Sequence, residues 1–176
     1  MPPQEGWSLK MVRLKKGVAG GSIRMRLHRV LRDVYGVDPV EYVEGRLGYT
    51  CIDNVCLIYV ADAAAPLGNT PVIYMGSWVA VLVSGELAPS IPLVEKIYKD
   101  KGVRAAIIVR EKGVKAFLYG NDVLPESIVE KREPVEGLVT VVDSSDHGIV
   151  GFAKWDPVRK VYRNIYDLGV YLRLLG

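Results

Sequence analysis

Two apolar, β-branched runs joined by a polar turn constrain the fold of this chain more than any other feature. Residues 138–142 (LVTVV) and 149–153 (IVGFA) flank a short segment rich in Ser, Asp and Gly. Such runs form β-hairpins, because the turn residues reverse the chain and the strands share one apolar face. A second apolar segment, residues 161–175, follows. The C-terminal part is therefore predicted to be a small, mostly-β unit with a closing strand.

The stretch FLYGNDVL, residues 117–124, precedes this hairpin. Its apolar start predicts the end of a strand over residues 116–119, and Gly120, Asn121 and Asp122 predict a tight turn. Glycine and asparagine adopt positive φ at low cost, so the chain can reverse here without strain. A short helical turn is expected near Pro125. The eight residues by themselves also suit an ordinary junction between a strand and a turn.

The N-terminal part is predicted to combine helices and strands in one domain. Ser22 is a good helix N-cap, apolar residues follow at helical spacing, and Gly36 ends the helix. A flexible basic loop, residues 15–22, is expected before it. The other predicted elements are a short strand or helix at 7–14, a hairpin at 49–60, strands at 72–75 and 79–84, a helix from Pro89 to about residue 100, a strand at 104–110 and another at 114–119.

These elements predict an α+β domain over residues 1–101, with an antiparallel sheet and flanking helices, followed by a second domain over 102–176. No Pro/Ser-rich linker separates the two, so tight packing between them is expected. No run approaches the ~18 apolar residues of a membrane span, and no apolar core follows the basic N-terminus as in a signal peptide. We therefore expect a cytoplasmic protein. The low content of Asn and Gln suits a thermophile.

Cys51 and Cys56 would face each other across the hairpin that turns at Asp53 and Asn54. No histidine lies near them, so no metal site is predicted. Free thiols are the default expectation in a reducing cytosol. A cross-strand disulfide is the alternative, because some intracellular proteins of thermophiles contain them.

Charge is distributed unevenly along the chain. Residues 1–35 hold eight Lys/Arg against two Asp/Glu, residues 36–150 hold ten against sixteen, and residues 151–176 hold five against two. Clustered positive charge at both ends is what phosphate binding needs, although solvated helix faces carry such patterns too. An exposed stripe of Arg24, His28 and Arg32 is expected on the first helix. The candidate N-terminal patch is Lys15, Lys16, Arg24, Arg29 and Arg32.

The order of strand, Gly-Asn turn, short helix, hairpin and closing strand resembles a PUA domain, a small pseudobarrel that binds structured RNA. FLYGNDVL, the VGF at 150–152 and the ending IYDLGVYLR at 165–173 resemble the large-subunit ribosome biogenesis factors of the Nip-seven type. The resemblance covers residues 72–176 and implies an RNA site. The residues it implies are Gly120, Asn121, Lys131 and Arg132 in the groove, and Lys154, Arg159, Lys160 and Arg163 in the late segment.

Aromatic residues interleave with the late basic residues, and they could stack on bases or simply pack in the core. They are Trp155, Tyr162, Tyr166 and Tyr171. Glu126, Glu130 and Glu133 depart from the pattern, because carboxylates beside the groove repel phosphate.

No catalytic machinery is predicted. Asp143, Ser144 and His147 lie in one hairpin tip, where a base cannot be set against a nucleophile with a third group behind it. The sequence predicts a non-catalytic RNA-binding assembly factor, a monomer without cofactor or metal, acting on pre-ribosomal RNA with other biogenesis or RNA-processing proteins. In eukaryotic relatives the resemblance implies a nucleolar location. The alternatives are an RNA-modification enzyme or its subunit, and a protein-interaction module without RNA.

Overall fold

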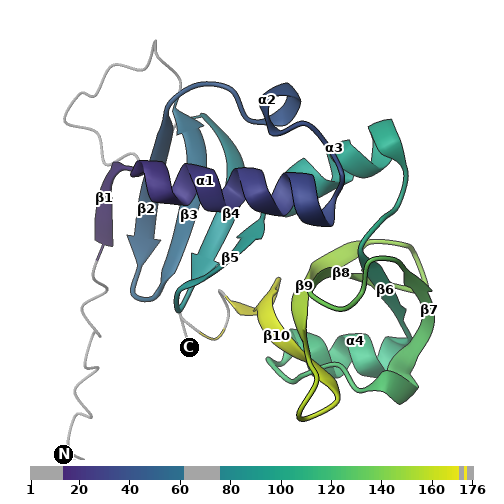
Figure 1. The fold of residues 1–176 in the computed structure, drawn as a ribbon. Coiled ribbons are helices and arrows are strands. Elements are labelled where there is room, and N and C mark those ends of the chain that lie inside the picture. The colour runs from purple at the N-terminus through teal and green to yellow at the C-terminus, as the bar shows by residue number, and fades with distance from the viewer. Residues whose placement is uncertain (1–13, 62–75, 171–172, 174–176) are drawn as a thin grey trace, which may run out of the picture.

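The protein folds around two five-stranded sheets (Figure 1). The structure is a computed structural model, and it describes residues 14–61, 76–170 and 173. The predicted strand at 72–75 and most of the segment at 7–14 lie outside these residues. The expected architecture is confirmed: an antiparallel sheet with flanking helices is followed by a second, mostly-β unit. No helix in the described part of the chain is long and apolar enough to cross a membrane.

The first sheet is an antiparallel meander in the order β1-β2-β3-β4-β5. Each strand follows the previous one in sequence, because tight turns between apolar runs favour pairing of neighbours. Its strands are β1 (Leu14–Val18), β2 (Leu47–Ile52), β3 (Val55–Ala61), β4 (Gly76–Val83) and β5 (Glu86–Pro89).

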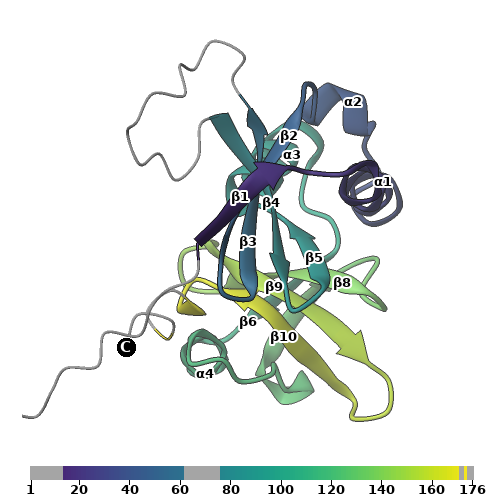
Figure 2. The ribbon, with the colours of Figure 1, turned by 90° about the vertical axis from the view of Figure 1, so that its left-hand side faces the viewer.

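Helical segments cover this sheet. α1 and η1 run across its face, as Figures 1 and 2 show, and insert Leu27 and Leu31, which are fully buried. Ser90 caps α3 by accepting a hydrogen bond from the Leu93 backbone N–H at 3.2 Å. The segments are α1 (Gly21–Arg29), the π-helical turn η1 (Val30–Val34), α2 (Pro39–Tyr42) and α3 (Ile91–Lys101).

The second sheet has the order β10-β9-β8-β6-β7, and β6 pairs parallel with β8. The predicted hairpin at 138–153 is confirmed as β8 and β9, and the closing strand as β10. The elements of this unit are β6 (Ala106–Val109), α4 (Glu111–Leu118), the 3-10 turn η2 (Pro125–Ser127), β7 (Ile128–Arg132), β8 (Leu138–Asp143), β9 (Ile149–Asp156) and β10 (Val161–Asp167).

The two sheets share one apolar core. Alternate residues of β6 face opposite sides, so Ala106 and Ile108 join the core of the first sheet while Ile107 joins a second core under α4. Trp78 of β4 meets Tyr166 of β10 edge-on, with ring centroids 6.2 Å apart. The side chains between the sheets are therefore continuous, and the boundary proposed at residue 101 falls between α3 and β6.

A buried polar cluster also joins the two parts. The Thr140 hydroxyl of β8 lies 2.9 Å from the Tyr35 hydroxyl and 2.8 Å from the Tyr98 hydroxyl. Burial raises the pKa of both tyrosines, so both stay neutral and keep their hydrogen-bonding protons. This cluster fixes α3 and the end of η1 against the second sheet.

The strand predicted at 114–119 is wrong, because these residues belong to helix α4. Val114 and Phe117 are buried three residues apart, and Glu111 pairs with Lys115 at 2.7 Å across one helical turn. Gly120, at φ 90°, then ends the helix rather than a strand. The spacing of apolar residues in so short a run is compatible with a strand or a helix. Packing against the second core favours the helix.

Two N-terminal expectations also need correction. The predicted basic loop contains strand β1, which pairs with β2 although it lacks an alternating apolar pattern. Gly20, not Ser22, is the N-cap of α1, and it makes no side-chain cap. Helix α1 begins earlier because the chain leaves β1 at Val18 and Ala19 still donates to the Leu47 carbonyl.

The cysteines form a disulfide, so the expectation of free thiols is wrong. Cys51 and Cys56 are register partners across the β2–β3 hairpin, as predicted, and their sulfur atoms are bonded. The turn at Asp53 and Asn54 places the two cysteines opposite each other. The alternative interpretation of the sequence is the correct one here.

Candidate nucleic-acid interface

The β9–β10 hairpin carries the predicted C-terminal cations. Lys154 and Arg163 are direct cross-strand partners, so their side chains project to the same face. Both reach Glu86 of β5: Lys154 Nζ lies 3.4 Å from Oε2, and Arg163 Nη2 lies 3.0 Å from Oε1. Glu86 therefore links the first sheet to the second through two partly exposed ion pairs.

The tip of this hairpin is fixed by Asp156. Its carboxylate accepts the backbone N–H groups of Val158 and Arg159, each at 3.0 Å, and the bond from Arg159 lowers the pKa of Asp156. The Arg159 side chain turns back to Asp122, with Nη1 2.8 Å from Oδ2. Lys160 is exposed at the tip with φ 54°. Arg159 and Lys160 thus lie on a hydrogen-bonded turn beside the exposed Val158.

A shallow hollow of about 200 Å³ lies between α1 and the second sheet. Arg26 and Arg29 line it from α1, Lys154 from β9 and Glu86 from β5. The Arg26 guanidinium donates to the Gly85 carbonyl at 2.6 Å, which fixes its direction. The remaining lining residues are apolar: Val30, Leu87 and Leu138.

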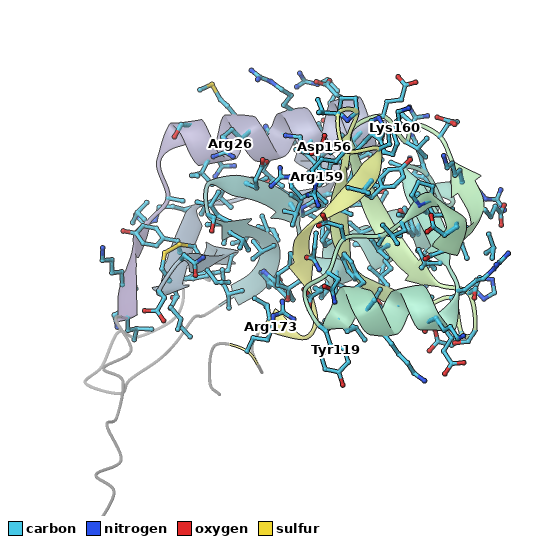
Figure 3. The ribbon with its side chains drawn as sticks, turned by 90° about the horizontal axis from the view of Figure 1, so that it is seen from below. Arg26, Tyr119, Asp156, Arg159, Lys160 and Arg173 are labelled. Atoms are coloured by element: carbon cyan, nitrogen blue, oxygen red, sulfur yellow. A yellow bond between two sulfur atoms is a disulfide. The ribbon has the colours of Figure 1, made fainter. Side chains whose placement is uncertain are left out.

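Arg26 is a site residue that the sequence analysis missed. Its spacing of three from Arg29 places the two on one side of the helix, a signal that the sequence contains. Nothing in the sequence indicates that this side of α1 faces β9. Figure 3 shows Arg26, Asp156, Arg159 and Lys160 along one side of the molecule, with Tyr119 and Arg173 on the opposite side.

Gly120 and Asn121 belong to that opposite side of the second sheet, at the end of α4. The Arg173 guanidinium covers Gly120, because a Cβ built there would lie 3.3 Å from its atoms. The Asn121 side-chain amide donates to the Ala116 carbonyl at 3.0 Å, so it caps α4. Tyr119 beside them is 80% exposed. The next residue, Asp122, pairs with Arg159 of the hairpin, whereas Gly120 and Asn121 themselves contact Arg173 and the end of α4.

The predicted pair Lys131 and Arg132 lies on β7, at the edge of the second sheet. The Lys131 ammonium lies 5.8 Å from the centre of the Tyr162 ring, a cation–π contact. Arg132 pairs with Glu130 at 2.6 Å. Both are exposed edge-strand residues, and the neighbouring carboxylates offset their charge.

The N-terminal cations do not form the expected exposed stripe. Arg24 and His28 are half-buried, and the Arg24 guanidinium donates to the Gly45 carbonyl. His28 Nε2 is buried without a hydrogen-bond partner; burial, then Arg24 and Arg32, lower the pKa of His28. Lys15 and Lys16 lie on β1, at the far edge of the first sheet from β5. Only Arg29 of this predicted patch lines the hollow.

The aromatic residues mostly pack in the core. Tyr162 and Tyr166 are buried, and Trp155 packs against Tyr162 with ring centroids 4.9 Å apart. Tyr166 stacks on Phe152 at 6.4 Å. Core packing, rather than base stacking, is therefore the role of Tyr162 and Tyr166. Tyr171 lies outside the described residues.

The hairpin tip with Asp143 and His147 is a capped turn. One Asp143 carboxylate oxygen accepts the Ser145 backbone N–H at 2.8 Å and the Ser145 hydroxyl at 2.7 Å. Among the described residues, no cluster of three His, Cys, Asp or Glu side chains could hold a metal ion.

The two ion pairs of Glu86 allow a prediction about how the contact between the two sheets contributes to stability. Burial raises the pKa of Glu86, but hydrogen bonds and charge from Arg163 and Lys154 outweigh it, so the pKa is lowered overall. The ion pairs therefore stabilise the fold above the carboxyl's unfolded-state pKa, and this contribution is lost as the pH falls through the lower folded-state value. We expect Glu86→Gln to lower the free energy of unfolding by up to about 1 kcal/mol at pH 7, because the pairs are partly exposed.

Urea unfolding at neutral pH and near pH 3 checks this expectation. The difference between wild type and Glu86→Gln should shrink at the acidic pH, and a difference that persists there would contradict the ion-pair origin. Glu126→Gln is the matched control, because Glu126 is exposed and takes part in none of the ion pairs found among the described residues.

The fold defines a protein in which an α+β unit is followed by a small, mostly-β unit. Residues 105–176 match the family model described as the UPF0113 PUA domain. The chain therefore contains a PUA domain, a fold that generally binds RNA. No curated protein matches the chain.

Solved structures share this architecture at low sequence identity. A conserved PUA-domain protein from Thermoplasma acidophilum has a TM-score of 0.56 at 17% identity. The match covers 88% of this chain and 95% of the Thermoplasma chain. A hypothetical protein from Pyrococcus horikoshii has a TM-score of 0.62 at 13% identity, with coverage of 87% and 94%. A PUA-domain protein from Aeropyrum pernix, solved as a tartrate complex, has a TM-score of 0.54 at 14% identity, with coverage of 93% and 91%. At these identities the likeness concerns the fold alone.

Proposed function

We propose that this protein binds RNA through the exposed face of its β9–β10 hairpin and acts without catalysis. The binding residues are Lys154, Arg159, Lys160 and Arg163. The observation that carries the proposal is the presence of these four cations on one hairpin of a PUA domain. Cations on a rigid hairpin can track a phosphate backbone, and each neutralised phosphate releases counterions into solution.

The finer proposal is an assembly factor for the large ribosomal subunit that holds pre-ribosomal RNA and acts in the cytoplasm. It is supported by the Nip-seven-type resemblance of residues 117–124 and 165–173. The protein would bind a folding intermediate of the RNA and be released when the RNA or a protein partner changes. The first sheet would offer its outer surface to such partners.

A protein-interaction module is the second candidate, and one observation favours it. Lys154 and Arg163 pair with Glu86, and Arg159 pairs with Asp122, so three of the four cations already have carboxylate partners. These pairs are partly exposed, and pairs of this kind contribute only about 0–1 kcal/mol, so phosphates can replace the carboxylates. RNA binding is therefore the function we favour.

An RNA-modification enzyme has less support than either of these two functions. The hollow beside α1 is lined by neither His28 nor the cysteines, which are joined in a disulfide. We propose that the chain has no catalytic residue and no cofactor.

Salt-dependent RNA binding tests the main proposal. The quadruple variant Lys154→Ala/Arg159→Ala/Lys160→Ala/Arg163→Ala is compared with wild type on single-stranded and stem-loop RNA. We expect affinity at low salt to fall by about a hundredfold or more, and the slope of log K against log[salt] to fall by about two to three. Fluorescence anisotropy over a range of KCl concentrations measures both quantities.

A matched control removes four exposed cations elsewhere, Lys96, Lys99, Lys101 and Lys112 on α3 and α4. It should bind RNA nearly as wild type does. Wild-type protein that binds no RNA at low salt would refute the proposal and leave the interaction module. Equal losses in the two quadruple variants would mean that only net charge matters.

A further inference from the structure

We propose that the hollow between α1 and β9 is a second phosphate subsite, so that an RNA strand bound on the β9–β10 hairpin continues onto α1. This inference rests on the proposed RNA-binding function and adds Arg26 and Arg29 to the site. The N-terminal unit would then bind RNA directly, through α1, instead of only presenting a surface to other proteins.

The two arginines of α1 are oriented for this role. Arg26 and Arg29 lie one helical turn apart and line the same hollow. A hydrogen bond to the Gly85 carbonyl directs the Arg26 guanidinium towards β5, and a carbonyl leaves its charge uncompensated. Among the described residues, neither arginine has a carboxylate within ion-pair distance. A planar guanidinium suits phosphate because its paired N–H groups match two phosphate oxygens.

The one carboxylate in the hollow does not cancel this charge. Glu86 already accepts from Lys154 and Arg163, so its negative charge is offset before Arg26 and Arg29 are considered. The hollow is therefore net positive. An incoming phosphate meets two arginines without a carboxylate partner among the described residues, and a lysine whose ion pair is weak and partly exposed.

Lys154 makes the hollow continuous with the hairpin. Its side chain lines the hollow and shares Glu86 with Arg163, its cross-strand partner. Arg163 is on β10, and the backbone N–H of Arg159 at the hairpin tip donates to the Asp156 carboxylate of β9. Figure 3 shows Arg26, Asp156, Arg159 and Lys160 along the same side of the molecule. The cations thus follow one path from α1 to the tip, which fits a strand of phosphates.

The shape of the hollow favours a strand over a small ligand. Sites for small molecules bury most of the ligand's surface, and they do so in an enclosed cleft. This hollow is open to solvent, and its lining combines cations from α1 and β9 with the apolar residues Val30, Leu87 and Leu138. A sugar-phosphate backbone can cross it with its phosphates near the cations and its less polar groups near the apolar residues.

The test compares a short and a long single-stranded RNA, of about 6 and about 20 nucleotides, because a single OB-fold module occupies about 4–16 nucleotides. The variant Arg26→Gln/Arg29→Gln removes both charges and keeps polar side chains with N–H donors, each shorter than arginine by two heavy atoms. We expect its affinity for the long RNA to fall about tenfold at low salt, with the salt slope reduced by about 1.4, the value for two phosphate contacts on single strands. Its affinity for the short RNA should stay within about twofold of wild type.

Two controls sharpen the result. Lys99→Gln/Lys112→Gln removes the same charge from exposed positions outside the hollow and should bind the long RNA as wild type does. Glu86→Gln removes the carboxylate and should tighten binding of the long RNA, the opposite direction. Thermal unfolding of each variant confirms that it is folded.

The outcomes separate the two proposals. A double variant that binds the long RNA as wild type does, while the quadruple hairpin variant loses binding, overturns the subsite and leaves the proposed function standing. Equal losses on the short and long RNA overturn the extension across the hollow. Inorganic tripolyphosphate that binds wild type more tightly than the long RNA, and loses binding in the double variant, overturns the strand in favour of a small phosphate ligand. Wild type that binds neither RNA overturns both proposals.

Discussion

Replacing Asp167 by alanine is expected to lower the free energy of unfolding by about 2–3 kcal/mol, the cost of leaving buried hydrogen-bond donors without their acceptor. Asp167 is fully buried at the end of β10. Its carboxylate accepts from the Gly169 backbone N–H at 2.8 Å, from the Asn164 amide at 3.0 Å, and from Arg173 at 3.0 and 2.7 Å. Removing it leaves these donors without their acceptor, and unsatisfied buried donors are costly.

The effect should spread beyond β10. The Arg173 guanidinium also donates to the Leu118 carbonyl at 2.7 Å, and Asn164 donates to the Phe117 carbonyl at 2.9 Å. Both acceptors lie at the C-terminal end of α4, where carbonyls lack intrahelical partners. Asp167 therefore orients the two side chains that hold α4 against the second sheet.

Urea unfolding monitored by circular dichroism measures this loss. Asp167→Asn keeps the shape and one acceptor oxygen, so its loss should be smaller than that of Asp167→Ala. Asp33→Ala, at an exposed position of η1, is the control and should change stability by less than about 0.5 kcal/mol. A loss below about 1 kcal/mol in Asp167→Ala would show that the network does not hold the sheet and helix together.

Gly151→Ala is expected to cost about 3 kcal/mol or more, at the upper end of what overpacking costs. A Cβ at this position would lie 2.1 Å from the Tyr166 carbonyl oxygen, 2.8 Å from the Asp167 Cα and 2.9 Å from the Phe117 ring. Two of these neighbours are backbone atoms of the paired strand β10, which cannot turn aside as a side chain can. The φ of 155° also belongs to a region that non-glycine residues rarely adopt.

The damage falls on the hairpin that carries the proposed RNA site, because Gly151 pairs with Asp167 in the β9–β10 ladder. Thermal and urea unfolding measure it. Gly137→Ala is the matched control, since a Cβ there meets nothing within 4 Å, and it should be neutral or slightly stabilising. A stability loss in Gly151→Ala no larger than that of the control would contradict the close approach of β10.

The sequence contained enough to predict most elements. Both long hairpins, helix α3 and the opposition of Cys51 and Cys56 follow from local signals: alternating apolar residues, turn residues at fixed places and prolines at the helix start. These features depend on neighbours in the chain, so they can be read without the fold. The FLYGN resemblance likewise led to the PUA domain that the family model matches.

Local sequence signals predicted the wrong element where a short segment is compatible with more than one secondary structure. Residues 111–118 are helical because Val114 and Phe117 pack into the second core, and a run this short has no unambiguous period. Strand β1 exists because β2 offers it a free edge, not because LKKGV favours a strand.

The grouping of the cations belongs to the tertiary structure alone. Charge counts located basic segments at both ends of the chain, but not which side chains face one another. The packing of α1 beside β5 and β9 brings Arg26 and Arg29 to Lys154, while Lys15, Lys16 and Gly120 lie elsewhere. Residues far apart in sequence meet only when helix and sheet bury their apolar faces together, and that burial determines which cations share a surface.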